Sequence, residues 1–308
     1  MGPAQEIETV KLRSADGMTE AEFAPEANMV CCSLRHRGAE LLDGGQGLQA
    51  YAERGKTMGI PLLYPWANRL SGLGYEAAGK RVSLEQAGEL IPHDPDGLPI
   101  HGVLPGLLRW HVEPGSVSDR VVARLDWGSS QLLELFPYRH EVRFAARLRE
   151  AELEIATTVR ATGPDPVPVS FGFHPYLRVP GARRNTYRVS LGAFRRLVLD
   201  ERMIPTGERV PVERRIFRLE DLSLDYALDG LELPPEFAVS AGGVALTVTF
   251  NHGFPFAQVY APPGHDYICF EPMTAPPNAL RSGDSLGVLA PGEQHRTAFS
   301  IRISRRLA

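Results

Sequence analysis

The sequence predicts an all-β protein, built as a large antiparallel β-sandwich. Three observations lead to this prediction: apolar and polar residues alternate with period two in several runs, turn-forming residues are abundant, and only one short stretch has a helical pattern. The chain of 308 residues contains 30 Gly and 26 Pro residues. Such numbers suit the many turns that connect short antiparallel strands.

The first half of the chain carries weak strand patterns before a strong one. Alternation is faint over residues 7–12 and 29–34 and clear over 121–127. Residues 129–135 then form the one stretch that looks helical, and it is short. We therefore expect strands at these three places and a single short helix.

The clearest strands form a predicted hairpin. Apolar residues alternate mainly with arginines over residues 142–149 and with polar, partly acidic residues over 152–160, and only Glu150 and Ala151 separate the runs. Alternation places one set of side chains on each face of a sheet. We expect the apolar set to face the core. We also expect opposed Arg and Glu side chains to pair across the solvent face, with about 0.2 to 1 kcal/mol per pair.

The second half of the chain continues the all-β pattern. Alternating runs occur over residues 187–191, 244–250 and 297–303, with a weaker one at 256–260. No fixed-period repeat, low-complexity tract or long linker interrupts the sequence. We expect one domain over residues 1–308, because β-sandwiches often reach this length without dividing.

Charge and cysteine content exclude several classes of protein. The formal net charge is −4, and acidic and basic residues are interleaved, which is unlike a nucleic-acid binder. The cysteines Cys31, Cys32 and Cys269 fit neither a disulfide framework nor a four-ligand zinc site. The sequence shows no signal peptide and no apolar run near the roughly 20 residues that span a bilayer. We expect a cytoplasmic protein without a membrane or nucleic-acid partner.

Four segments interrupt the alternation and do not look like plain strands. Each places a polar or ionisable side chain among aromatic, Gly and Pro residues, which can hold a functional group rigidly and shield it from water. These segments are residues 65–72, 99–102, 171–176 and 270–278.

Taken singly, the polar residues of these segments have ordinary structural explanations. His174 and His101 can be hydrogen-bonded core histidines, and Glu271 can be a carboxylate paired with an arginine. Asn68 and Arg69 can belong to a surface turn whose arginine pairs with a nearby acid. None of these residues is a specific signal by itself.

Taken together and in order, the four segments resemble the motifs of the aldose 1-epimerases, the galactose mutarotase family. The resemblance extends from about residue 29 to residue 303. Its motifs are Pro-Trp-Ala-Asn68-Arg69-Leu-Ser-Gly, Ile-His101-Gly, Phe-His174-Pro-Tyr and Phe-Glu271-Pro-Met-Thr-Ala-Pro-Pro-Asn. The resemblance implies a large antiparallel β supersandwich, in agreement with the alternation.

The resemblance also implies site residues. Glu271 would be the catalytic base and His174 the catalytic acid. Arg69, His101 and Asn68 would bind the sugar substrate. A looser match, Leu224-Asp225-Tyr-Ala-Leu-Asp229-Gly, implies a sugar-binding aspartate, and its leading Leu-Asp favours Asp225 over Asp229. No cofactor and no metal are implied.

The expected chemistry needs one base and one acid at the anomeric carbon. A proton must leave the O1 hydroxyl while another reaches the ring oxygen, and each positioned group contributes about 10² to 10⁴ in rate. Free Glu and His titrate near 4.3 and 6.5, so work at neutral pH requires tuning. We expect the nearby carboxylate to raise the pKa of His174 and apolar neighbours such as Phe270 and Met273 to raise that of Glu271.

Other interpretations stay open on the sequence alone. The chain could bind or sense a sugar without turning it over, or Asp225 could be the second carboxylate of a glycoside hydrolase. A hexose-6-phosphate epimerase would need a cluster of Arg or Lys around a phosphate, and neighbours such as Arg35, Arg37 and Arg54 could converge near Arg69 in space. Trp66 could stack on a sugar, although packing is the favoured reading. The preferred aldose and the oligomeric state are undetermined.

Overall fold

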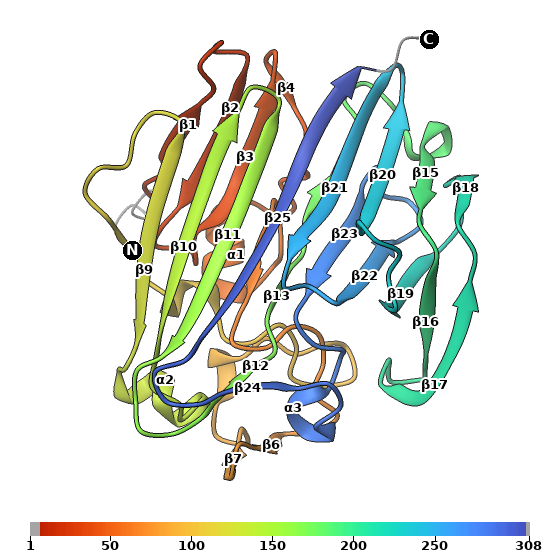
Figure 1. The fold of residues 1–308 in the computed structure, drawn as a ribbon. Helices are drawn as coiled ribbons and strands as arrows, with labels where there is room; N and C mark the ends of the chain where they lie inside the picture. Colours follow the sequence, from red (N-terminus) through yellow and green to blue (C-terminus); the bar gives the residue numbers. More distant parts are fainter. Residues whose placement is uncertain (1–6, 306–308) are drawn as a thin grey trace.

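Two large antiparallel sheets face one another and enclose the hydrophobic core (Figure 1). The computed structural model describes residues 7–305. In Figure 1 a nine-stranded sheet lies in front of an eight-stranded sheet. Neighbouring strands within both sheets run antiparallel, so the predicted all-β antiparallel sandwich is confirmed.

The nine-stranded sheet contains the predicted hairpin and most of the strands with clear alternation. In spatial order its strands are β18 (Arg215–Arg218), β15 (Arg188–Leu191), β20 (Glu236–Ala241), β21 (Val244–His252), β25 (Gln294–Arg305), β11 (Glu152–Ala161), β10 (His140–Arg149), β9 (Arg120–Trp127) and β8 (His111–Val112).

The eight-stranded sheet is shorter and less regular. In spatial order it contains β17 (Pro205–Val212), β16 (Phe194–Leu199), β19 (Leu224–Asp229), β22 (Phe256–Ala261), β23 (Ile268–Met273), β13 (Gly172–Phe173) and β5 (Leu62–Leu63), with β14 (Tyr176–Leu177) also paired to β23.

Smaller elements complete the fold. Three small sheets comprise β1 (Val10–Arg13), β2 (Thr19–Ala24), β3 (Val30–His36) and β4 (Ala39–Glu40); β12 (Val167–Val169) with β24 (Gly287–Leu289); and β6 (Gly74–Ala77) with β7 (Lys80–Ser83). The α-helices are α1 (Leu48–Arg54), α2 (Ser130–Leu135) and α3 (Ala279–Ser282), and the 3-10 turns are Gly88–Leu90, Pro105–Leu107 and Arg184–Thr186.

The hairpin β10–β11 forms as predicted, but its charges pair differently. Its apolar residues are buried, and Arg147 lies directly opposite Glu154. Nevertheless, within residues 7–305 no ion pair joins β10 to β11. The charged side chains reach the flanking elements instead, as in Arg147 with Asp119 at 3.4 Å and Arg302 with Glu152 at 2.9 Å. The expected pairing across the hairpin is therefore wrong.

The prediction of a single helix is also incomplete. Helix α2 is where the sequence indicates it, and its first turn is capped by the Ser129 side chain, which accepts from the Leu132 amide. Helix α1 was not predicted, because Gly47 provides no side-chain cap and seven residues are too few for a clear helical period. It ends at Gly55, whose φ of 65° suits glycine.

Strands β19 and β23 lie in segments that do not alternate in sequence. All six residues of β23 are buried, because the strand is covered on both faces and paired on both edges. Strands buried on both faces lose the polar half of the pattern. The segment 270–278 therefore begins as a central strand rather than as a loop.

Aromatic side chains pack between the two large sheets. Phe173 contacts Phe299 with ring centroids 4.9 Å apart, and Phe270 contacts Phe237 at 5.7 Å. Each buried Phe contributes about 1.5 to 3 kcal/mol. Because neighbouring residues of a strand point to opposite faces, Phe270 in the core directs Glu271 to the other face of the eight-stranded sheet.

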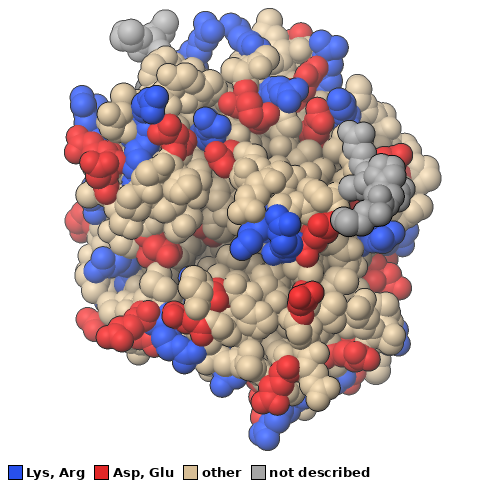
Figure 2. All heavy atoms as spheres, turned by 180° about the vertical axis from the view of Figure 1, so that it is seen from behind, with Lys and Arg blue, Asp and Glu red and all other residues tan. Residues whose placement is uncertain are grey.

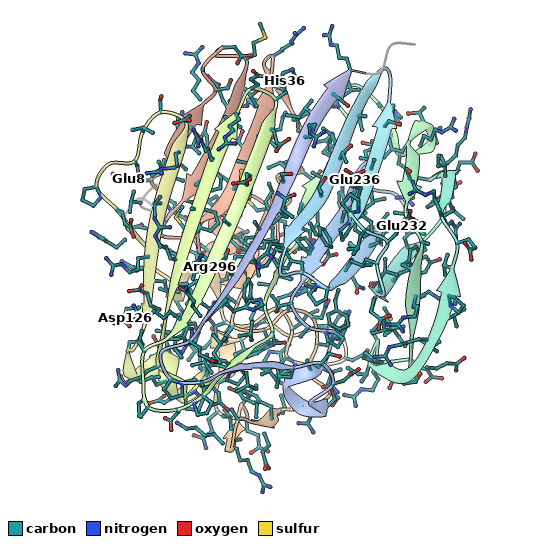
Figure 3. The ribbon with its side chains drawn as sticks, viewed as in Figure 1. Glu8, His36, Asp126, Glu232, Glu236 and Arg296 are labelled. Atoms are coloured by element: carbon teal, nitrogen blue, oxygen red, sulfur yellow. The ribbon has the colours of Figure 1, made fainter. Side chains whose placement is uncertain are left out.

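The outer surface is charged but not segregated by sign. Asp126, Glu236 and Arg296 are exposed on strands β9, β20 and β25 of the nine-stranded sheet (Figure 3). On the face shown in Figure 2, acidic and basic side chains are interspersed. Within residues 7–305, no helix has both the length and the apolar character that crossing a bilayer demands.

Candidate active site

Strand register assembles the acidic side of the site. Gln258 of β22 lies directly opposite Glu271 of β23, and Asp225 of β19 lies opposite Tyr260 of β22. Residues two apart on one strand share a face, so Gln258 and Tyr260 point the same way. Three neighbouring strands therefore present two carboxylates, an amide and a phenol on one face.

His174 is held at the edge of this face by backbone hydrogen bonds. It lies in the short connection between β13 and β14, where its amide donates to the Pro61 carbonyl at 3.1 Å. Two residues later, the Tyr176 amide donates to the Gly59 carbonyl at 2.8 Å. Gly59 has a φ of 60°, and a β-carbon there would lie 2.2 Å from the Cys31 carbonyl oxygen. Only glycine permits this close approach.

Two loops supply the basic side of the site and are joined to each other. Arg69 and Ile100 form a β-bridge, and the His101 amide donates to the Asn68 carbonyl at 3.1 Å. Asn68 and His101 both have positive φ, at 56° and 63°. Such backbone conformations are uncommon outside glycine and are often found at functional sites.

These strands and loops enclose a cavity of about 200 Å³. At about 30 Å³ per water molecule this is the scale of one small sugar ring rather than a long ligand. Hollows of about 810 and 490 Å³ elsewhere are larger, but neither is lined by both a histidine and a carboxylate. The cavity lining includes all six residues expected at the site: Asn68, Arg69, His101, His174, Asp225 and Glu271, together with Thr57, Ile100, Tyr176, Gln258 and Tyr260.

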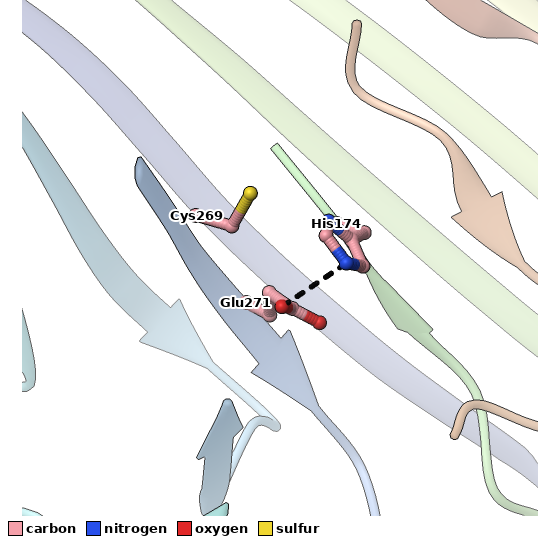
Figure 4. Close-up of side chains that lie close together, drawn as sticks. All are labelled: His174, Cys269 and Glu271. Carbon is pink, nitrogen blue, oxygen red and sulfur yellow. Dashed lines mark ion pairs between the residues drawn. The ribbon is translucent and has the colours of Figure 1, made fainter. Parts of the chain in front are cut away.

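Glu271 and His174 lie in direct contact in the cavity wall (Figure 4). Glu271 Oε1 is 3.3 Å from His174 Nε2. Glu271 is 1% exposed and His174 is 6% exposed. Neither carboxylate oxygen, nor His174 Nδ1, has a hydrogen-bond partner within residues 7–305. Buried polar atoms are normally hydrogen-bonded, so this cluster suits a polar ligand.

Burial determines the protonation of this pair. It raises the pKa of Glu271 well above its ordinary value, with a further contribution from the Asp225 charge, while Arg69 acts in the opposite direction. Burial also lowers the pKa of His174 to about 3. The expected rise for Glu271 agrees in direction, but the expected rise in the pKa of His174 is wrong, because desolvation is the largest cause and a protonated Glu271 supplies no charge to oppose it. The free pair therefore holds one proton in its uncharged form.

Tyr176 was part of the sequence motif, although no role was predicted for it. Its ring stacks on His174, with centroids 4.4 Å apart and planes 12° apart. Its hydroxyl lies 3.5 Å from His174 Nε2 and 2.6 Å from the Thr57 hydroxyl. Each hydroxyl can donate or accept a hydrogen bond. The Tyr176 hydroxyl can therefore accept from a protonated His174 Nε2 or donate to an unprotonated one.

Arg69 is both a cavity residue and an ion-pair partner. Its Nε donates to Asp94 Oδ2 at 2.7 Å, and the Asp94 side chain is 3% exposed. Burial alone would raise the pKa of Asp94, but hydrogen bonds from the Leu98 amide and from Arg69 bring it below its ordinary value. No sequence signal identified Asp94, since its link to Arg69 spans 25 residues.

The structure separates the two candidate aspartates. Asp225 lines the cavity, where Gln258 Nε2 donates to it and burial raises its pKa. Asp229 instead binds Arg195 at 2.8 Å and Arg209 at 2.7 Å and does not line the cavity. The structure therefore brings Asp225, not Asp229, together with the Glu271 and His174 pair.

Gln258 and Tyr260 are cavity residues that the sequence did not identify. They lie in the weakly alternating run 256–260, and that alternation predicts a shared face for them. Their place beside Glu271 depends on the register of β22 against β23. Trp66, by contrast, is completely buried and absent from the cavity lining, so its reading as packing is correct.

One group of side chains near the cavity has the composition of a metal site. Donor atoms of His174, Cys269 and Glu271 all lie within 4.8 Å of one another, and all three residues are buried. The group contains the ionisable pair itself (Figure 4). Proton transfer by Glu271 and His174 requires no metal at this group.

Known proteins resemble this chain in sequence and in fold. A family model described as aldose 1-epimerase matches residues 29–302. The Escherichia coli (strain K12) protein YihR, which has no assigned function, is 24% identical over 259 residues, covering 80% of this chain and 79% of that protein.

Two solved structures share the fold. Slr1438 of Synechocystis sp. PCC 6803 superposes with a TM-score of 0.78 at 22% identity, covering 98% of this chain and 97% of that protein. Galactose 1-epimerase of Lactobacillus acidophilus NCFM superposes with a TM-score of 0.75 at 14% identity, covering 98% and 100%. At these identities, the likeness establishes the supersandwich fold alone.

Proposed function

This chain belongs to the aldose 1-epimerase family, and we propose that it interconverts the α and β anomers of a free aldose by acid/base ring opening and closure. The observation that carries the proposal is the buried contact of 3.3 Å between Glu271 and His174 in the wall of a small cavity. O1 and the ring oxygen are bonded to the same carbon of the sugar, so adjacent acid and base groups can reach both.

Ring opening requires two proton transfers. The Glu271 carboxylate takes the proton of the O1 hydroxyl, and C1 and O1 form a carbonyl. The bond between C1 and the ring oxygen breaks, and the ring oxygen takes a proton from the His174 imidazolium. After rotation about C1 to C2, the same groups reverse their roles and close the ring on the other face.

Burial of the pair favours the open-chain state. Opening leaves Glu271 protonated and His174 neutral, which is the uncharged form that burial stabilises in the free site. Before opening, a proton must pass from Glu271 to His174 across their contact of 3.3 Å. Sugar hydroxyls that donate to the two unpartnered carboxylate oxygens would favour this ionised form.

The remaining polar groups are proposed to hold the sugar away from C1. Arg69, His101, Asn68 and Asp225 line the other walls of the cavity. Asn68 Nδ2 and His101 Nδ1 are buried without partners among the described residues, so both are available to sugar hydroxyls. Hydrogen bonds to charged groups such as Arg69 and Asp225 contribute about 1.5 to 3 kcal/mol each.

The cavity does not favour a phosphorylated sugar. Arg35, Arg37 and Arg54 do not line it, and of the Lys and Arg residues between 7 and 305 only Arg69 does. Arg35 pairs with Glu40 at 3.3 Å instead. A phosphate usually needs several donors of positive charge. This composition supports a free aldose over a hexose 6-phosphate.

The test is anomeric equilibration of freshly dissolved α-glucose, α-galactose and other aldoses, followed by polarimetry or proton NMR at catalytic enzyme concentration. We expect acceleration over buffer for at least one free aldose. Glu271→Gln and His174→Asn should each reduce it about 10²- to 10⁴-fold, because each removes one proton-transfer group.

A sugar-binding protein without turnover would give a different result. In that case, no free or phosphorylated sugar would equilibrate faster than in buffer, although calorimetry would still detect binding. A variant that kept the full rate would remove the substituted residue from the mechanism.

A further inference from the structure

We propose that His174, Cys269 and Glu271 form an inhibitory binding site for a thiophilic divalent cation such as Zn²⁺. The inhibitory effect rests on the function proposed above, whereas the binding site itself does not. The sequence offered no histidine spacing typical of a metal site, because the three residues come together only through strand pairing.

Strand pairing brings three metal-binding side chains close together. Cys269 and Glu271 are two residues apart on β23, so both side chains project from the same face. Tyr176 of β14 pairs with Cys269, which brings the neighbouring His174 beside them. The sulfur, nitrogen and oxygen donors lie within 4.8 Å of one another (Figure 4).

The surroundings also suit a bound cation. Both oxygens of Glu271 and Nδ1 of His174 lack hydrogen-bond partners within residues 7–305, although both residues are more than nine-tenths buried. Cys269 is completely buried. Unpartnered donor atoms in a dry site can be satisfied by a metal ion as well as by a sugar.

The donor set selects the kind of cation. Thiolate and imidazole ligands favour Zn²⁺ and related soft ions, whereas Mg²⁺ and Ca²⁺ prefer oxygen ligands. Zinc binds sulfur at about 2.3 Å and nitrogen or oxygen at about 2.0 to 2.2 Å. The donors must therefore approach one another by about 1 Å when the cation binds.

Binding of the cation stops the proposed reaction. The metal takes a nitrogen lone pair of neutral His174, the carboxylate of Glu271 and the thiolate of Cys269, and both the Glu271 carboxyl group and the Cys269 thiol release their protons to solvent on becoming ligands. Neither the base nor the acid is then available to the sugar. Three protein ligands leave a fourth position, which a water molecule can fill.

The experiment titrates chelator-treated protein with Cd²⁺ and Zn²⁺. Cd²⁺ bound to a thiolate gives an ultraviolet charge-transfer band, which reports binding without any sugar. We expect one Cd²⁺ per chain, a thiolate band, and inhibition of anomeric equilibration by both ions that sugar relieves. In Cys269→Ser and Cys269→Ala, the band should disappear and inhibition should weaken by more than the 10- to 100-fold typical of losing an outer-shell partner.

The controls separate this proposal from the proposed function. Cys32→Ser removes a half-buried thiol on β3 and should leave the band and the inhibition intact. Without metal, both Cys269 variants should still equilibrate sugars. Absence of the band in the unaltered protein, or its persistence in both Cys269 variants, would refute the metal site. A band without any sugar turnover would refute the proposed function and leave the metal site standing.

Discussion

Asp225 and Asp229 lie on the same strand and the same face, four residues apart, yet their surroundings differ. Asp229 is bound by two arginines, Arg195 at 2.8 Å and Arg209 at 2.7 Å. Among residues 7–305, Asp225 has only the neutral amide of Gln258 as its hydrogen-bond partner. Burial raises its pKa, and the charge of Arg69 only partly opposes this.

The comparison shows that partners, rather than residue type or burial, distinguish a structural carboxylate from a site carboxylate. When a buried charge is fully paired, removing one member of the pair destabilises the fold because the other charge is left buried without a partner. A buried charge that is only partly compensated has a higher free energy in the free protein, and a ligand can supply the missing donors. Glu271 is the extreme case, because neither of its oxygens has a hydrogen-bond partner within the described chain.

The largest effect that tests this comparison is expected from Asp225→Asn. The substitution removes a charged acceptor from the cavity, so the KM for the sugar should rise about 10- to 100-fold. The free energy of unfolding should stay level or increase, since a half-buried carboxylate with a raised pKa is lost. Steady-state polarimetry and urea unfolding measure the two quantities. Unchanged KM would show that Asp225 does not contact the sugar.

Asp229→Asn is the matched variant on the same strand and should have the opposite result. It weakens two charge-assisted hydrogen bonds, so the free energy of unfolding should fall by about 1.5 kcal/mol. This value is at the low end of the range for hydrogen bonds to charged groups, because Arg195 is half exposed and solvent screens its charge. Urea unfolding measures this change. The kcat and KM should stay within about twofold of the unaltered protein, and a large loss of activity would contradict the separation of the two aspartates.

Asp94→Asn sharpens the comparison by loosening an arginine that faces the cavity. The asparagine can still accept from the Asp96 and Leu98 amides, so the loop should keep its shape. Arg69 loses its charged partner at 2.7 Å, and we expect about a fivefold higher KM with little change in kcat. Asp96→Asn, two residues along the same loop, is the control. Equal effects of both variants would indicate a general loop defect.

The smallest expected effect is that of pH on kcat/KM. An untuned pair would lose its single proton above about pH 6.5. Here the pKa of Glu271 is raised and that of His174 is lowered to about 3. The pair therefore keeps one proton over a wider pH range than the interval from about 4.3 to 6.5 that free Glu and His would give. The rate should stay level as the pH rises through 6.5, and fall only when Glu271 loses its proton. A pH titration by polarimetry that broke near 6.5 would contradict the pKa shifts.

Much of the fold was predictable because alternation reports directly on half-buried strands. The hairpin of residues 142–160 and the strands at 121–127, 244–250 and 297–303 alternate clearly, and all form. Strand β23 was not predicted, because burial on both faces removes the polar residues that would alternate with the apolar ones. Helix α1 was missed because it is short and lacks a capping side chain.

The candidate site was predictable only as far as its motifs. Asn68, Arg69, His101, His174 and Glu271 stand in ordered motifs that resemble one family, and the structure brings them into one cavity. Gln258 and Asp94 carried no motif, since they join the site through strand register and through an ion pair. Their roles depend on which residues they contact, and a linear pattern does not record this.

By itself, the sequence determined the all-β class, the strongest strands and the order of the polar motifs, because side-chain periodicity and local composition are properties of the chain. Tertiary structure alone established that Asp225, which the motif only favoured, faces the cavity, and that burial lowers the pKa of His174 rather than raising it. It also decided that Cys269 lies beside the acid and the base. Each of these depends on desolvation and on partners distant in sequence, and burial of the Glu271 and His174 pair between strands is what shifts both pKa values.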